Sequence, residues 1–181
     1  FYERLAYDEI LANLIVLSKI RSRIKKNKKN KKVFFNKLSK FLISNFKFTL
    51  TSNQIKIIQD INFDLKSDRK MFRLLQGDVG SGKTIVSLIA ASNVIESNFQ
   101  VAMMAPTEIL AQQHYDLAKK IFNNTNVKIV NFIGSLKSSK KKEILKDLSN
   151  GKINFVIGTH ALFQKNVIFK NLGLVIIDEQ H

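Results

Sequence analysis

The sequence predicts an α/β fold in which a parallel sheet is flanked by helices. Two observations lead to this prediction. After about residue 70, short and almost continuous apolar runs alternate with segments of helical periodicity, which is the pattern of βαβ units with strands buried on both faces. In addition, three of the seven glycines lie within residues 77–82, between an apolar run and a helical segment. Such clusters mark places where the main chain approaches another group closely.

The first 45 residues are predicted to form a separate part of the chain. Apolar residues between Leu5 and Ile24 recur at near-helical spacing with charges between them, which indicates a long amphipathic helix. The run "KKNKKNKK", residues 25–32, has no apolar face to bury. We therefore divide the chain into a helix with a basic linker, residues 1–45, and an α/β domain, residues 46–181.

The elements of the second part follow from the same periodicities. Short helices are expected around residues 38–42 and over residues 52–65. The expected strands are residues 72–76, 100–105, 127–133, 153–159 and 172–178, and the helices between them are residues 85–95, 108–121 and 140–148. Asn150 and Gly151 follow the last of these helices, where a left-handed cap residue belongs.

The chain is strongly basic, with a net charge of +16 and a pI of about 10.1. Such an excess favours a polyanionic partner. However, only five of the thirty basic residues are arginine, and a composition rich in lysine, asparagine and isoleucine also arises from an A·T-rich genome. Residues 1–45 hold twelve basic and three acidic side chains, so much of the excess is concentrated there.

Several classes of site are excluded by composition. The chain has no cysteine, which rules out disulfides and thiolate metal sites. Its three histidines, at 114, 160 and 181, are too scattered for a zinc cluster. The longest apolar stretches, residues 10–17 and 85–91, are shorter than the roughly 18 residues of a membrane span. We expect a monomeric cytoplasmic protein without a membrane segment.

Residues 77–84, "GDVGSGKT", match the pattern of a phosphate-binding P-loop. Gly77, Gly82, Lys83 and Thr84 satisfy G-x-x-x-x-G-K-S/T between an expected strand and an expected helix. In this motif backbone N–H groups and the helix amino end face phosphate, the lysine reaches the β- and γ-phosphates, and the hydroxyl binds Mg²⁺. The alternative is a glycine-rich turn with an incidental lysine, which the surrounding pattern disfavours.

A second part of a nucleotide site is predicted at the end of the last strand. In "LVIIDEQH" four apolar residues precede Asp178 and Glu179. The carboxyl ends of parallel strands form the ligand crevice of an α/β sheet, so Asp178 is expected beside the P-loop, where it would hold the metal. Glu179 would orient and deprotonate a water molecule. For this stretch alone, two acids that merely end a strand would be the better interpretation, but the P-loop upstream favours the nucleotide site.

Gln54 has two compatible interpretations. "TSNQ", residues 51–54, has the form S/T-x-x-Q, so Thr51 and Gln54 are expected to form a helix capping box. The amide of Gln54 also carries both a donor and an acceptor, which suits the edge of an adenine base. We give these two interpretations equal weight.

In its motifs the sequence closely resembles the first motor domain of the RecG family of bacterial ATP-dependent DNA helicases, which belong to superfamily 2. The matching segments, in order, are "GDVGSGKT", "APTEILAQQH", "GSLKSSKKKE", "GTHALFQ" and "VIIDEQH". "FTLTSNQ" resembles the adenine-recognition segment of that family, and "RLAYDEILANLIVL" its connecting helix. The resemblance implies a RecA-like P-loop NTPase domain, ATP and Mg²⁺ as cofactors, and movement on branched DNA such as stalled forks and Holliday junctions.

The resemblance also implies roles for individual residues. Gln54 would contact adenine, with Phe48 or Leu50 against the base. The residues that would cradle phosphate and Mg²⁺ are Gly80, Ser81, Gly82, Lys83 and Thr84. Asp178 would hold the metal, and Glu179 would be the catalytic base.

Three loops just beyond expected strand ends are implied to contact the DNA backbone without reading its sequence. They contain Pro106, Thr107 and Glu108, then Gly134 and Ser135, and then Thr159 and His160. From the residues alone, the first of these is an ordinary helix start and the second a turn. Gln180 and His181 are implied to couple the nucleotide state to a second RecA-like domain, and His114 is expected on the surface of its helix.

Two rival functions stay open at this point. One is another superfamily 2 translocase that moves on duplex DNA, such as a transcription-repair coupling factor. The other is a module in which ATP only switches DNA affinity. A second motor domain with arginine fingers and a DNA-splitting wedge domain are not contained in these 181 residues. We therefore expect a fragment that binds Mg·ATP weakly and scarcely hydrolyses it.

Overall fold

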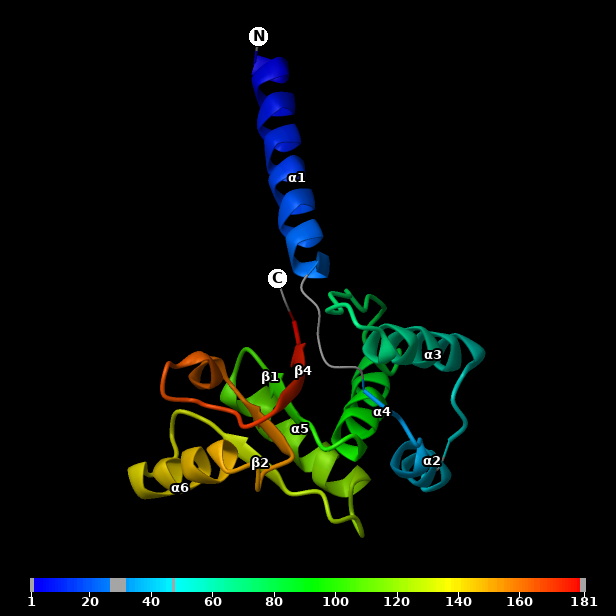
Figure 1. Cartoon of the computed structure of the whole chain (residues 1–181), viewed down its shortest axis with the longest axis vertical. Helices are drawn as coiled ribbons and strands as arrows, with labels where there is room; N and C mark the ends of the chain where they lie inside the picture. Colours follow the sequence, from blue (N-terminus) through cyan, green and yellow to red (C-terminus); the bar gives the residue numbers. More distant parts are fainter. Residues whose placement is uncertain (1, 27–31, 47, 180–181) are drawn as a thin grey trace.

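A four-stranded parallel sheet in the order β2-β3-β1-β4 forms the centre of the domain (Figure 1). The computed structural model describes residues 2–26, 32–46 and 48–179. Its helices are α1 (Tyr2–Lys26), α2 (Lys37–Ser44), α3 (Ser52–Lys66), α4 (Lys83–Glu96), α5 (Glu108–Ile121), α6 (Ser138–Ser149) and the 3₁₀ turn η1 (His160–Phe163). Its strands are β1 (Gln100–Met104), β2 (Ile129–Phe132), β3 (Phe155–Gly158) and β4 (Leu172–Ile177).

The sheet is covered by helices on both faces, as the continuous apolar strands predicted. Successive side chains of a strand point to opposite faces. Val101 and Met103 of β1 therefore join the larger core together with α4, while Ala102 between them joins the smaller core with α6. All five residues of β1 are buried, and so are nine of the fourteen residues of α4. The prediction of an α/β fold with a parallel sheet is confirmed.

The helix boundaries agree closely with the predicted ranges. The bounds of α5 are those predicted from the sequence, and α4 begins two residues earlier than expected, at Lys83. Gly151 has a φ of +76° after α6, and its N–H donates to the carbonyl of Leu148, so the predicted left-handed cap is confirmed.

The segment that enters the domain packs against the same core as α4. Phe34 and Leu42 are buried members of the larger core. The carboxylate of Glu96, at the end of α4, accepts hydrogen bonds from the backbone N–H groups of Lys37 and Leu38, at 3.0 and 3.3 Å. An anionic group at the amino end of a helix satisfies N–H groups that have no partner within the helix. In this way Glu96 joins α2 to α4.

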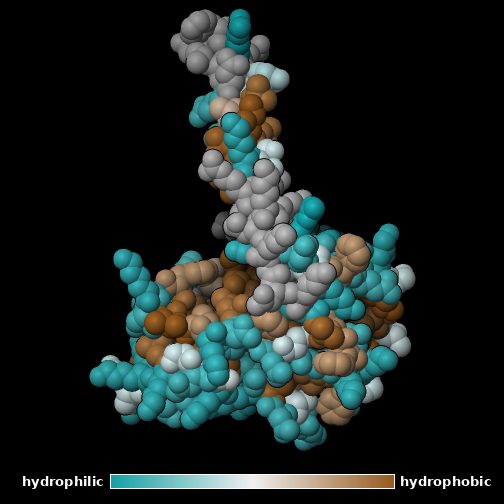
Figure 2. Space-filling model, viewed as in Figure 1, coloured by the Kyte–Doolittle hydropathy of each residue, from teal (hydrophilic) through white to brown (hydrophobic). Residues whose placement is uncertain are grey.

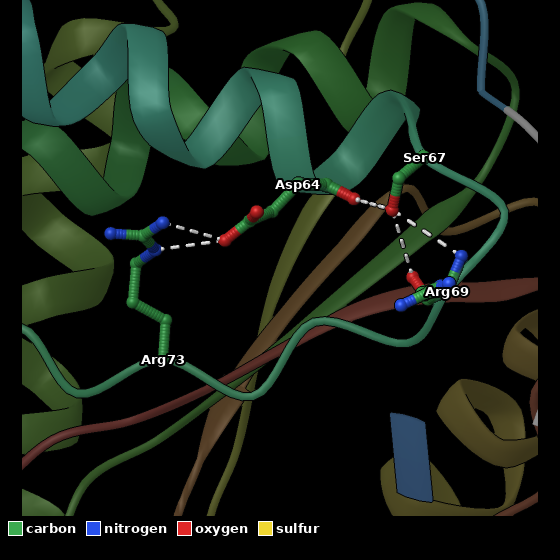
Figure 3. A network of polar contacts seen from close by, with 4 residues as sticks. All are labelled: Asp64, Ser67, Arg69 and Arg73. Atoms are coloured by element: carbon green, nitrogen blue, oxygen red, sulfur yellow. Dashed lines mark hydrogen bonds and ion pairs between the residues drawn. The ribbon is translucent and has the colours of Figure 1, made fainter. Parts of the chain in front are cut away.

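A polar network holds the chain where it leaves α3 (Figure 3). Arg73 Nε and one terminal nitrogen both donate to Asp64 Oδ2, at 3.0 and 2.7 Å. Ser67 Oγ donates to the backbone carbonyl of Asp64 at 2.7 Å and accepts a hydrogen bond from the Arg69 N–H at 3.3 Å. These contacts hold residues 67–73 against the end of α3.

The prediction of a strand over residues 72–76 was wrong. These residues have no regular secondary structure, and Phe72 and Leu74 are exposed. A strand requires a neighbour to satisfy its backbone hydrogen bonds. Within the described part of the chain, β4 pairs with β1 alone and is an edge strand, so residues 72–76 do not complete the sheet.

The prediction of a long helix near the start of the chain is confirmed by α1, which projects away from the rest of the molecule (Figure 1). Figure 2 shows apolar residues along it that no other element covers. They include Tyr7, Ile10, Leu14 and Val16, each more than half exposed. Among the described residues, we find no helix with the length and apolar content of a membrane span.

Candidate functional site

The predicted P-loop joins an irregular segment to the amino end of α4. Gly80 and Gly82 have φ values of +80° and +86°, a backbone region in which residues with a Cβ are strained. Gly82 is the N-cap residue of α4, and Lys83 opens the helix. Lys83 Nζ donates to the backbone carbonyls of Gly77 and Asp78, at 2.7 Å each. The ammonium group is therefore bound by backbone carbonyls of its own loop.

Gln54 connects the start of α3 to this loop. Its side-chain Oε1 accepts from the backbone N–H of Thr51 at 2.9 Å. The backbone N–H of Gln54 donates to Thr51 Oγ1 at 3.2 Å, so the predicted capping box is confirmed. Its Nε2 also donates to the carbonyl of Ser81 at 2.9 Å. A Cβ at position 82 would lie 2.4 Å from that Nε2. Glycine at position 82 thus permits both the backbone turn and the close approach of Gln54.

These residues fit a magnesium nucleotide. Two glycines with positive φ, the amino end of α4 and the Lys83 ammonium are the groups that bind phosphate. Protein sites for Mg²⁺ usually supply one or two carboxylates, and phosphates and water provide the rest. Among the described residues, no three His, Cys, Asp or Glu side chains form a metal site. The hydroxyl of Thr84 and the carboxylate of Asp178 are oxygen donors, the kind of ligand that Mg²⁺ takes in proteins.

Asp178 follows β4 directly and is held at two points. Its backbone N–H donates to the carbonyl of Met104 at 2.9 Å, which continues the pairing of β4 with β1. Its Oδ2 lies 2.6 Å from His114 Nε2 on α5. Glu179 is exposed and has a φ of +47°.

The expectation that His114 lies on the surface of its helix was wrong. His114 is buried, with only 9% of its surface exposed. It lies three residues after Ala111 and four before Ala118, both fully buried, and this spacing defines the inward face of α5. The two small alanines on either side were the signal in the sequence that this face is packed.

The P-loop and Asp178 lie toward the same edge of the sheet. Helix α4 packs against β1 and β4, and only residues 97–99 join it to β1. It must therefore run antiparallel to β1, which brings its amino end toward the carboxyl ends of both strands (Figure 1). Within residues 48–179, no hydrogen bond or ion pair joins the loop to Asp178, since Lys83 contacts Gly77 and Asp78 while Asp178 contacts His114.

The first two loops with predicted DNA contacts are joined to each other. Thr107 caps α5 by accepting a hydrogen bond from the Leu110 N–H at 3.3 Å. Glu108 accepts from the Ser135 N–H at 3.0 Å and from Ser135 Oγ at 2.7 Å. The hydrogen bond from the Ser135 hydroxyl is the main reason that the pKa of Glu108 is lowered. The Glu108 carboxylate is therefore turned toward the second loop, where a Cβ at Gly134 would lie 3.0 Å from it.

The other predicted residues lie in the loops after β1 and β3 or outside the described part of the chain. Pro106 is half-buried after β1, and Thr159 precedes η1 after β3. His160 is exposed, with its ring 6.5 Å from that of Phe163. Gln180 and His181, predicted to couple the nucleotide state to a partner domain, lie outside the described residues.

Comparisons with known proteins support one family. Residues 51–181 match the family model described as DEAD/DEAH box helicase. The ATP-dependent DNA helicase RecG of Thermotoga maritima is 46% identical over 179 residues, which are 99% of this chain and 23% of the relative. The corresponding protein of Aquifex aeolicus is 44% identical over 181 residues, again 23% of its length. The chain thus spans about a quarter of the length of these curated relatives.

Solved structures agree with this match. A structure of RecG bound to a three-way DNA junction superposes on this chain with a TM-score of 0.90 at 46% identity. The matched region is 99% of this chain and 25% of the RecG chain. A DEAD box protein from Methanococcus jannaschii superposes with a TM-score of 0.57 at 25% identity, over 82% of this chain and 42% of its own.

Proposed function

Since the chain belongs to the DEAD/DEAH box helicase family, we propose that it carries the ATP-binding half of the motor of an ATP-dependent DNA helicase that acts on branched DNA. The observation that carries this proposal is the likeness to RecG bound to a three-way junction, which extends over 99% of this chain and 25% of the RecG chain. The P-loop geometry and the acidic residues after β4 support this proposal, because they would supply the phosphate-binding and metal-binding parts of such a motor.

Each part has a proposed role. Gly77, Gly80, Ser81 and Gly82 would bind phosphate through their backbone, and Lys83 would leave its loop carbonyls for the β- and γ-phosphates. Thr84 and Asp178 would hold Mg²⁺, which when bound neutralises the charge that develops on the phosphates during transfer. Glu179 would deprotonate the attacking water, and Gln54 would contact adenine while it remains attached to the P-loop.

The DNA partner would meet the loops that follow β1, β2 and β3. Backbone N–H groups and hydroxyls in these loops suit phosphate contacts that do not depend on sequence. Gln180 and His181 would pass the nucleotide state to a second RecA-like domain, supplied by the longer protein of which this chain would be a part.

The test is Glu179→Gln in the full-length protein, with Glu143→Gln on α6 as the matched control. We expect E179Q to lower DNA-stimulated ATP hydrolysis by at least about 10²-fold, since general-base catalysis contributes about that much. It should leave nucleotide affinity within twofold, and E143Q should behave as the wild type. If E179Q still unwinds a three-way junction at the wild-type rate, the proposal of an ATP-driven motor is wrong, and ATP acts only as a switch of DNA affinity.

A further inference from the structure

Helix α5 extends from the first predicted DNA-contact loop to the acid at the end of β4. Its N-cap residue is Thr107, and its first residue is Glu108, which binds the second loop through Ser135. Six residues further along, His114 contacts Asp178. At 1.5 Å per residue these two points are about 9 Å apart along the helix axis. One helix therefore carries a predicted DNA contact at one end and, near its middle, the histidine that contacts Asp178.

The contact between His114 and Asp178 is short and shielded from water. The atoms are 2.6 Å apart, and the side chains are 11% and 28% exposed, respectively. A carboxylate oxygen is an acceptor, and an imidazole Nε2 that carries a proton is the matching donor at this distance. This contact holds the carboxylate through Oδ2, while the backbone N–H of Asp178 donates to Met104 and holds the main chain.

A residue that does not itself bind a metal often orients one that does, through a hydrogen bond. Ligating carboxylates are themselves hydrogen-bonded, and the loss of such a partner typically costs about 10- to 100-fold in metal affinity or activity. His114 has the position of such a partner, because it lies on a different element from Asp178, 64 residues away in the chain.

We propose that His114 is a positioning residue for Asp178, and that α5 thereby connects DNA bound at its amino end to the carboxylate that would hold Mg²⁺. The inference rests on the proposed function, because it takes Asp178 as the metal ligand. DNA that presses on the loops joined by Glu108 and Ser135 moves α5, and His114 transmits that movement to Asp178. DNA occupancy and metal binding are thus linked without any contact between the two ligands.

The test compares three variants of the full-length protein. His114→Leu removes the donor, His114→Gln keeps an N–H on a side chain of similar reach, and Gln113→Leu makes the same change at an exposed neighbour on α5. Two quantities are measured. The first is the affinity for a fluorescent ATP analogue with and without Mg²⁺, and the second is the factor by which a three-way junction stimulates ATP hydrolysis.

We expect H114L to lower the Mg²⁺-dependent gain in nucleotide affinity, and the stimulation factor, by about 10-fold or more. Binding of the junction, measured by fluorescence anisotropy, should stay within twofold. H114Q should recover most of both quantities, and Q113L should match the wild type. If H114L does not fold, His114→Met takes its place.

The inference is overturned if H114L keeps both quantities at the Q113L values. It is also overturned if H114Q is as impaired as H114L, because the N–H is then not what matters. Failure of the proposed function would be seen differently, as a wild-type protein that binds Mg·nucleotide but is not stimulated by DNA. In that case the Mg²⁺-dependent affinity of H114L still decides whether His114 positions Asp178.

Discussion

Glu108 accepts two hydrogen bonds from Ser135, one from the backbone N–H at 3.0 Å and one from the hydroxyl at 2.7 Å. This pair joins the loop after β1 to the loop after β2, 27 residues apart in the chain. A carboxylate would repel a DNA phosphate if it pointed at it, so its direction toward Ser135 matters. Glu108 thus joins the two loops, and it does so through the N–H and the hydroxyl of Ser135.

The first prediction concerns the pH dependence of stability. The hydrogen bond from the Ser135 hydroxyl holds the pKa of Glu108 below its ordinary value of 4.5. The stabilisation is therefore complete above that value, and it is lost as the pH falls through the lower pKa of the folded state. In urea unfolding between pH 7 and pH 3, the wild type should lose this contribution at the acid end, and Glu108→Gln should lack it throughout.

Glu143→Gln is the control for this measurement, because Glu143 is an exposed carboxylate on α6. It should reproduce the wild-type pH profile. A constant difference between the wild type and E108Q at every pH would contradict the role given to the ionised carboxylate.

The second prediction separates backbone strain from side-chain contact in the P-loop. Alanine at Gly80 or at Gly82 adopts a left-handed conformation that costs about 1–2 kcal/mol. Only at Gly82 would the new Cβ also meet Gln54 Nε2, at 2.4 Å, whereas nothing lies within 4 Å at Gly80. Gly82→Ala should therefore lower nucleotide affinity and the free energy of unfolding more than Gly80→Ala does.

The double variant Gln54→Ala with Gly82→Ala tests the cause. Because Gln54→Ala by itself removes the capping box and the bond to Ser81, the double variant is compared with Q54A, and in that background G82A should cost only the backbone strain. Equal losses for G80A and G82A would show that the contact with Gln54 is unimportant.

The third prediction concerns Gln100, which is buried at the start of β1. Its Nε2 donates to the carbonyls of Leu148 and Ile153, and its Oε1 accepts from the Asn171 N–H. Gln100→Met keeps the length of the side chain but leaves these three groups without their partner. We expect a loss of at least about 1–3 kcal/mol in the free energy of unfolding. Gln113→Met, at an exposed site, should change it by less than about 0.5 kcal/mol.

The fourth prediction concerns the 181-residue chain by itself. Arginine fingers are typically worth about 10³ to 10⁵ in the rate of phosphoryl transfer, and such a group would come from a second motor domain. The isolated chain should therefore bind Mg·ATP weakly and hydrolyse it at least about 10³-fold more slowly than the full-length protein with DNA. Turnover of the isolated chain comparable to that of the full-length protein would contradict the assignment to half of a motor.

The local features of this chain could be predicted because their causes are local. The bounds of α5 follow from the 3.6-residue periodicity and from Thr107 as cap, and the Thr51–Gln54 capping box follows from two residues three positions apart. The parallel sheet could be predicted because strands buried on both faces must be apolar throughout. The residue types of the P-loop and of the acidic pair are likewise local patterns.

The predictions that were wrong depended on partners distant in the chain. Residues 72–76 have the composition of a strand, but a strand forms only where another strand offers its backbone, and here they lie outside the sheet. His114 was expected on the surface of its helix, yet it is buried and contacts Asp178, which lies 64 positions away in the chain.

By itself, the sequence determined the helices, the four strands that pair in the sheet and the family that the motifs resemble, and it predicted where phosphate would bind. Only the tertiary structure decided that Gln54 holds the P-loop at Ser81, that Glu108 joins two loops through Ser135, and that His114 holds Asp178. The physical reason is one of range. Periodicity and capping act within a few residues, whereas a hydrogen bond between elements exists only after packing has brought a donor and an acceptor within about 3 Å of each other.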